Sequence, residues 1–182
     1  MHCNKYLIKS GVLASTLLMP SFVFANNFNY NHLEFAYQTN PNAMGAVARL
    51  ALHENAHVLG HVSTQWEGDW FSGVGVGFNG PINGFVDVTG DLTLNYLREP
   101  GAKDHDTGEL ANTINIGVRA WIQPNVELNF TVGRFFLDKD DSYGEVKFGA
   151  RLYSNETFSL GIQWAPVSYF DDSVTFSVRY EF

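Results

Sequence analysis

The sequence ends in Val174-Thr175-Phe176-Ser177-Val178-Arg179-Tyr180-Glu181-Phe182, where apolar side chains occupy every second position. The residues between them are small, polar or charged. A period of two indicates a β-strand with one apolar and one polar face. We therefore expect the chain to end in a two-faced strand.

The same alternation recurs upstream, in residues 33–37, 74–78, 86–94, 114–122, 126–132, 146–152 and 158–164. A soluble sandwich would alternate too, but here the polar face mixes glycine with charges of both signs, which favours a narrow, crowded interior. Strands of about ten residues can cross a bilayer when tilted. Backbone groups in lipid need partners, so such a sheet must close. The predicted fold class is all-β, a transmembrane, antiparallel, up-and-down β-barrel.

The connections between these segments alternate in length. Tight turns are predicted at 53–56, 79–83, 123–125 and 154–156, and longer, more acidic connections at 38–43, 66–70, 98–109, 137–142 and 166–173. Short periplasmic turns and long outer loops are typical of outer-membrane barrels. The count predicts ten strands with both termini in the periplasm. Eight strands are the alternative, because the alanine-rich start of segment 44–65 favours helix.

The composition excludes several other classes. The chain has 182 residues, a net charge of −8 and one cysteine. No stretch is long and apolar enough for a membrane-spanning helix, one cysteine excludes a disulfide scaffold, and the acidic excess argues against nucleic-acid binding. Its 15 Phe, 8 Tyr and 4 Trp argue against disorder. We expect many of these rings in two girdles, near the loops (Trp66, Trp70, Tyr96, Tyr143, Trp164, Tyr169) and near the turns (Phe78, Tyr153, Phe158, Phe182).

Residues 1–25 are interpreted as a cleaved secretory signal peptide. Lys5 and Lys9 precede a short apolar run, and Ala25 supplies a small residue at the cleavage site. Cleavage would remove Cys3 and leave an outer-membrane domain of residues 26–182. Its net charge would be −10, because both lysines are lost.

The terminal run resembles the C-terminal signature of bacterial outer-membrane proteins. That resemblance implies that Phe182, Tyr180 and Val178 form the signal read by the barrel-assembly machinery. The chain is also similar to the small outer-membrane β-barrel proteins of gammaproteobacteria, some once proposed as quorum-sensing factors, within the OmpA/OmpX-like class. The similar stretches are 28–34, 51–60, 118–128 and 148–156. This family has no agreed catalytic residues, so no site is carried over.

The inward phase of the predicted strands holds charges of both signs. They form a candidate lumen charge network of Glu34, Arg49, Asp87, Asp91, Arg119, Glu127, Glu145, Lys147, Arg151 and Arg179. One interpretation is a structural set of ion pairs that fills the barrel. The other is a narrow pore whose selectivity these charges set. Inward glycines, such as Gly73, Gly77 and Gly161, are expected to leave room for water.

One motif suggests an alternative from another class. His53-Glu54-Asn55-Ala56-His57 matches H-E-x-x-H, in which two histidines on a helix bind zinc beside a general base. A zincin-like secreted hydrolase is therefore kept as an alternative. The barrel interpretation instead makes Glu54-Asn55 a turn, and leaves His53, His57 and His61 as weak metal-binding candidates. A barrel-rim enzyme acting on lipid or peptide is a further alternative, although Ser63 is expected to face away from His61.

The main prediction is a non-enzymatic outer-membrane barrel with a structural or narrow-pore role and no cofactor. Its expected partners are membrane lipid, lipopolysaccharide, periplasmic chaperones and the barrel-assembly machinery, with no nucleic acid. The acidic outer loops, including Asp104-His105-Asp106 and Asp138-Lys139-Asp140-Asp141, would contact the lipopolysaccharide surface through divalent cations. The pattern predicts no particular oligomeric state.

Overall fold

The structure, a computed structural model, describes residues 27–98, 108–137 and 141–182. The predicted signal peptide lies outside the described residues. Within them no helix is both long and apolar enough to cross a membrane. The strands are β1 (His32–Thr39), β2 (Asn42–His53), β3 (Ala56–Thr64), β4 (Trp70–Asn83), β5 (Val86–Arg98), β6 (Glu109–Gln123), β7 (Val126–Leu137), β8 (Ser142–Tyr153), β9 (Phe158–Val167) and β10 (Ser173–Glu181).

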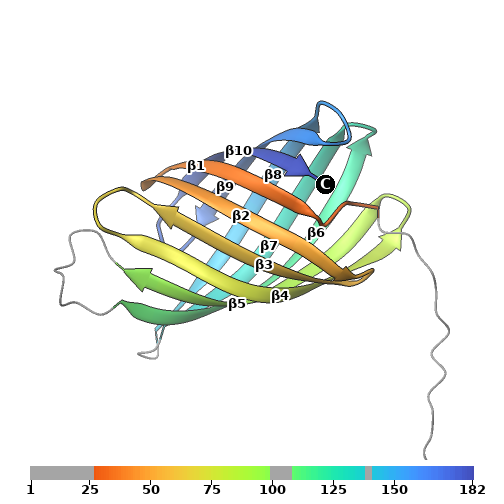
Figure 1. The fold of residues 1–182 in the computed structure, drawn as a ribbon. Coiled ribbons are helices and arrows are strands. Elements are labelled where there is room, and N and C mark those ends of the chain that lie inside the picture. Colours follow the sequence, from red (N-terminus) through yellow and green to blue (C-terminus); the bar gives the residue numbers. More distant parts are fainter. Residues whose placement is uncertain (1–26, 99–107, 138–140) are drawn as a thin grey trace, which may run out of the picture.

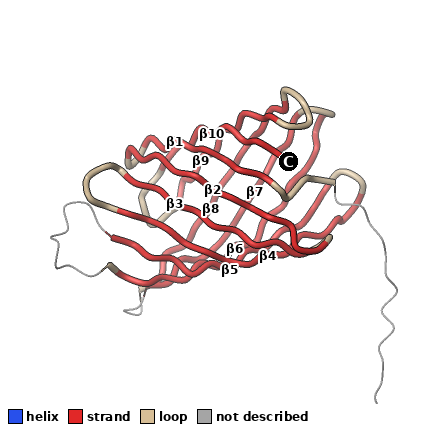
Figure 2. Tube along the Cα trace, in the orientation of Figure 1, coloured by secondary structure: helices blue, strands red, loops and turns tan. Residues whose placement is uncertain are grey.

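The ten strands form a closed barrel in which each strand pairs antiparallel with its neighbours in sequence. The ring closes where β1 pairs with β10, from His32 opposite Glu181 to Gln38 opposite Thr175. The prediction of a ten-stranded, up-and-down barrel is confirmed, and the eight-stranded alternative is wrong. Figures 1 and 2 show the strands running side by side, tilted, around a single barrel.

The β2–β3 hairpin, where the sequence pattern for strands is weakest, is regular. Strand β2 runs from Asn42 to His53 and pairs with β1 on one side and β3 on the other. Outward Met44 and Leu50 alternate with inward Gly45 and Arg49. Alanine is the best helix former, but intrinsic propensity is a weak preference, and ladder hydrogen bonds to two neighbouring strands override it.

One predicted turn is misplaced. The Asn79–Asn83 stretch has turn-like composition, yet β4 continues through it and the chain turns at Gly84-Phe85. Pro81 lies beside a register shift between Pro81 and Asn83, where a strand tolerates a residue without an N–H. The Asn79 side chain is buried and does not close a turn; its amide donates to the Glu54 carbonyl oxygen of the neighbouring hairpin (2.8 Å).

The outer surface of the barrel is apolar across the middle of every strand. Val76, Ile116 and Leu160 are each more than half exposed, at 57%, 53% and 58%. A water-soluble protein rarely exposes a continuous apolar surface of this extent. Because the ring has no free edge, every backbone group within this belt can be paired, as lipid requires. The protein is therefore a transmembrane β-barrel whose strands cross a lipid bilayer.

The tight turns gather at one end of the barrel and the longer connections at the other (Figure 1). The described chain starts and ends at the turn end, where Phe182 donates its backbone N–H to the carbonyl oxygen of Asn31 (3.2 Å). Two residues predicted for the aromatic girdles, Tyr153 and Tyr169, instead face the lumen. Tyr153 shares the inward phase of Arg151, so the alternation itself places it inside.

Candidate functional site

The barrel encloses a cavity of about 570 Å³. At its base, toward the turn end, the lining includes His32, Arg119 and Glu127. At the loop end it includes Asp69 and Tyr169. Between these levels the wall is built from inward residues of β1 to β10, because every second side chain of each strand points into the lumen. The cavity therefore runs along most of the barrel.

On one side of the lumen, Asp91 lies between two cationic or titratable groups. Arg49 on β2 donates to both carboxylate oxygens of Asp91 on β5, at 3.2 and 3.0 Å. His57 on β3 contacts the same carboxylate at 2.8 Å through Nε2 and Asn79 through Nδ1 at 3.1 Å. His57 is almost fully buried. These contacts tie β2, β3, β4 and β5 together across the lumen face.

On the opposite wall, Glu34 on β1 accepts from two arginines. Arg151 Nη2 donates to Oε1 at 2.7 Å and Arg179 Nε donates to Oε2 at 2.8 Å. Arg151 also donates to Ser177 Oγ at 3.0 Å. Since β1 and β10 form the closing seam, with β9 and β8 beyond, this cluster holds the two chain ends of the barrel together.

A third pair lies at the base of the cavity. Arg119 on β6 donates to Glu127 on β7 through two parallel bonds of 2.8 Å each. Tyr153 on β8 donates to the same carboxylate at 2.7 Å. A bidentate arginine–carboxylate pair is stronger and more directional than a single contact. Only 1% of the Glu127 side chain is exposed, so this pair is shielded from water.

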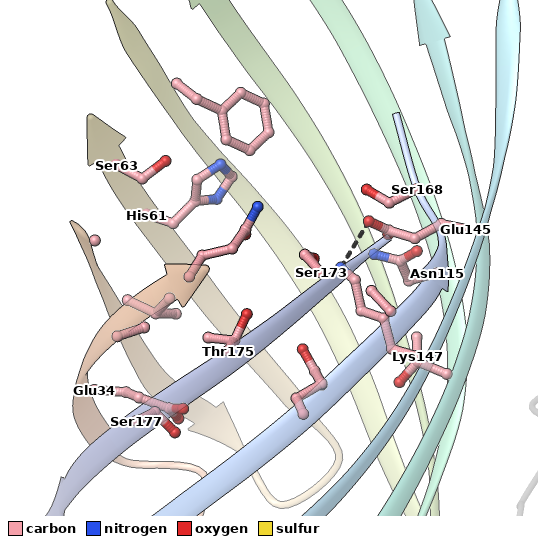
Figure 3. Close-up of a pocket in the computed structure, with 18 of the residues that line it drawn as sticks. Glu34, His61, Ser63, Asn115, Glu145, Lys147, Ser168, Ser173, Thr175 and Ser177 are labelled. Atoms are coloured by element: carbon pink, nitrogen blue, oxygen red, sulfur yellow. Dashed lines mark ion pairs between the residues drawn. The ribbon is translucent and has the colours of Figure 1, made fainter. Parts of the chain in front are cut away.

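The fourth pair is the most exposed to the cavity. Lys147 Nζ and Glu145 Oε1 are 2.7 Å apart on β8, with 28% and 15% of their side chains exposed. In the amide orientation that satisfies its neighbours, Asn115 donates to the other Glu145 oxygen at 3.1 Å. Figure 3 shows this pair with Thr175 and Ser173 around it, all pointing into the same space. Their exposure places both charges in contact with the open space of the cavity.

Nine of the ten residues of the predicted charge network thus form ion pairs with one another. The exception is Asp87, which is fully buried at the turn end. Its two carboxylate oxygens accept hydrogen bonds from Asn27 (2.7 Å) and from the Tyr30 hydroxyl (3.0 Å). Asp87 therefore anchors the segment that precedes β1, and is not paired with a cation of the network.

The inward glycines make room mainly for neighbouring side chains. A Cβ at Gly77 would overlap His57 Nε2 and Asp91, and one at Gly161 would approach Ser177 Oγ (2.6 Å) and Arg151 Nη2 (2.7 Å). The expectation that these glycines leave space for water is therefore wrong at these two positions. Here the missing side chain lets buried ion pairs reach across to the facing strand.

The sequence interpretation missed the segment of residues 27–31, which crosses the turn end of the lumen. Phe28 and Tyr30 are 4% and 2% exposed. The Phe28 ring stacks on Trp121 with ring centres 5.0 Å apart, and the Tyr30 ring stacks on His57 at 5.4 Å. One signal could have revealed this. Phe28 and Tyr30 continue the inward phase of His32 and Glu34 upstream of the strand.

The loop end of the lumen is narrowed by a second aromatic group. Phe71 on β4 packs against Phe135 on β7 (6.1 Å) and against Phe170 in the β9–β10 connection (5.3 Å). Tyr169 stacks on Phe135 with ring centres 5.0 Å apart. The cavity therefore lies between an aromatic cluster at the loop end and segment 27–31 at the turn end.

The H-E-x-x-H motif lies on a hairpin. His53 ends β2, Glu54 and Asn55 form the turn, and His57 belongs to β3. A zincin site needs both histidines on one face of a helix, so this arrangement contradicts the zincin-like alternative. Across the part of the chain that the structure describes, no group of three or more His, Cys, Asp or Glu side chains is placed to hold a metal ion.

Two other sequence expectations concern the loop end. Ser63 and His61 both line the lumen (Figure 3), so the expectation that they face opposite sides is wrong, because residues two apart on a strand share a face. The His61 ring packs against Phe71, with ring centres 4.9 Å apart.

Among the acidic loop residues, Asp69 is buried and accepts backbone hydrogen bonds from Gln65 and Glu67. The loop residues Asp104, His105, Asp106, Asp138, Lys139 and Asp140 lie outside the described residues.

No protein-family model and no curated protein sequence matches the chain. Solved structures do match. The structure of the KdgM porin aligns with a TM-score of 0.55 and 8% identity, over 83% of this chain and 99% of that one. The structure of the NanC porin aligns with a TM-score of 0.53 and 7% identity, over 83% and 98%. At such low identity the likeness shows a shared barrel fold.

Proposed function

We propose that this protein is a narrow pore of the outer membrane that passes ions and small polar solutes. The observation that carries the proposal is the 570 Å³ cavity, which follows the barrel axis and is lined by charged side chains. A barrel that serves only as a structural element needs no such space, since a ten-stranded interior is only slightly wider than one that side chains can fill.

The charges of the lining support weak selectivity. Six cationic side chains face the cavity, namely Arg49, Arg98, Arg119, Lys147, Arg151 and Arg179. Five carboxylates do, namely Glu34, Asp69, Asp91, Glu127 and Glu145. Buried ion pairs keep the wall polar while leaving little net field along the lumen. We expect small solutes of either charge to pass, with selectivity set by the exposed pair Glu145 and Lys147.

The shared fold supports the same proposal. The KdgM and NanC structures that align with this chain are both porins. The placement of the tight turns and of both described chain ends at one end of the barrel favours a periplasmic position for that end. A role of the acidic loops in contacting lipopolysaccharide stays a prediction.

Planar-bilayer recordings test the proposal. Full-length protein, folded in detergent and shown to migrate faster on a gel before heating than after, is added to one side of the membrane. We expect discrete current steps, which heat-denatured protein added at the same concentration does not give. The proposal is wrong if the folded protein gives no steps at any voltage and a Phe28→Ala/Tyr30→Ala variant is equally silent.

A further inference from the structure

We infer that residues 27–31 form a tethered plug. When seated, the plug closes the turn end of the pore, and its movement out of the lumen opens the pathway. The inference rests on the proposed pore function and goes beyond it by assigning a gate. It starts from position. In the ring of ten strands, β6 lies five places from β1 in either direction, so the two strands face each other across the lumen.

The segment spans that diameter. At one end Asn31 adjoins β1, where its side chain accepts from the Ala51 N–H (2.9 Å). At the other end the carbonyl oxygen of Asn27 accepts a hydrogen bond from Trp121 Nε1 on β6 (3.0 Å), and the Asn27 amide donates to the Asn83 carbonyl oxygen (2.6 Å). A chain that crosses the lumen from wall to wall obstructs it.

The rings of the segment fill the space that remains. Arg119, at the base of the cavity, lies over the Phe28 ring at 4.4 Å and over the Tyr30 ring at 5.1 Å. The Phe28 ring therefore contacts both this guanidinium and the Trp121 ring. The cavity thus ends against Arg119, and the next layer toward the turn end is aromatic. An apolar layer across a narrow lumen blocks ions even where small gaps remain.

The way the segment is held makes it removable. Residues 27–31 belong to no strand, and their contacts are side-chain stacks, cation–π contacts and isolated hydrogen bonds. The barrel closes through the β1–β10 ladder, which begins at His32. Residues 27–30 can therefore leave the lumen without breaking any ladder bond of the barrel, and only their ring contacts and isolated hydrogen bonds oppose this movement.

Buried and exposed side chains alternate along the segment, so a comparison of neighbouring positions tests whether the segment lies in the lumen. Phe28 is buried and its neighbour Asn29 is exposed. Phe28→Cys and Asn29→Cys are each made in a full-length Cys3→Ser background, and the rate of modification by a small thiol reagent is measured. We expect Phe28→Cys to react at least about tenfold more slowly than Asn29→Cys. Equal rates would show that the segment is not seated, and would overturn the inference.

Conductance then tests whether the seated segment closes the pore. Phe28→Ala/Tyr30→Ala removes both rings. The matched control is Phe35→Ala/Tyr37→Ala, which makes the same F-x-Y to A-x-A change on the outer face of β1, where both rings are exposed. We expect the plug variant to give a severalfold larger mean conductance than wild type and the control to match wild type.

The remaining outcomes separate the two proposals. If the thiol rates differ but wild type and the plug variant conduct equally, the segment is seated without closing the pathway, and the inference that it gates the pore is wrong. If the thiol rates differ and both proteins are silent, the pore function itself is wrong, and the gate falls with it. Each reading requires that all variants show heat-modifiable migration, which establishes that the barrel is folded.

Discussion

Arg119 and Glu127 face each other across the β6–β7 hairpin and form a bidentate ion pair with two bonds of 2.8 Å. The pair joins three features of the barrel. It forms the floor of the cavity. The Glu127 carboxylate accepts a hydrogen bond from the Tyr153 hydroxyl, and the Arg119 guanidinium lies over the rings of Phe28 and Tyr30. Its energetics are therefore a sensitive measure of whether the lumen is organised as described.

Removal of one partner should be costly. Arg119→Ala leaves the Glu127 carboxylate buried without its cation, and breaking a buried pair this way typically costs about 3–5 kcal/mol. Equilibrium unfolding in urea from lipid vesicles measures the change. Lys147→Ala is the matched control, because its pair with Glu145 is more exposed to the cavity and should contribute much less. Equal destabilisation by the two variants would contradict this description of the lumen.

An added side chain should be tolerated poorly at Gly77, which faces the lumen, and well at Gly60, which faces outward beside Val74. Gly77→Ala places a methyl group against His57 and Asp91, so we expect a loss of about 1–3 kcal/mol of stability from overpacking. At Gly60, the nearest neighbour of an added Cβ is a carbonyl oxygen 3.7 Å away, so Gly60→Ala should be close to neutral. The same unfolding measurement compares them. A neutral Gly77→Ala would show that the His57–Asp91 contact is loose.

The membrane position of the barrel can be tested by a charge on its outer face. Val76, near the middle of β4, is exposed and lies between outward Val58 and Leu92 on the neighbouring strands. Val76→Arg should destabilise the barrel in vesicles by about 2–4 kcal/mol, because it puts a cation in hydrocarbon. Thr89→Arg, whose side chain would enter the lumen, serves as the control. If Val76→Arg had no effect on stability, the outer face would not be in contact with lipid.

The terminal residue is expected to act in assembly more than in stability. Phe182 is more than half exposed and stacks on Tyr180 with ring centres 6.0 Å apart. If Phe182, Tyr180 and Val178 form an assembly signal, Phe182→Ala should lower the amount of protein in the outer membrane of cells severalfold while leaving unfolding in vesicles almost unchanged. Normal membrane levels of the variant would contradict the assembly role.

The fold was predictable because the period-two pattern is a local property. The alternation in 174–182 and in the upstream segments assigns each residue to the lipid or lumen face before any contact is known, and the turn and loop lengths give the strand count. The same rule places Glu34 and Arg151 inside. Their pairing depends on β1 meeting β10 with β8 two strands away, which is a property of ring closure and register.

The errors have local causes. Asn79-Gly80-Pro81 has the composition of a turn, but Asn79 is used as a buried hydrogen-bonding residue and the bulge at Pro81 absorbs the missing donor. The segment 27–31 was missed because it is short and carries no turn or strand signal of its own. Its inward phase becomes meaningful only once a lumen exists for Phe28 and Tyr30 to fill.

The central claim is that current passes through the lumen beside Glu145 and Lys147. Reversal potentials under a salt gradient test it most directly, with Lys147→Glu and Glu145→Lys compared with wild type. We predict shifts of opposite sign, toward cations for Lys147→Glu and toward anions for Glu145→Lys, with the double exchange close to wild type. Identical reversal potentials in all four proteins would show that the ions take another path, and would contradict the account.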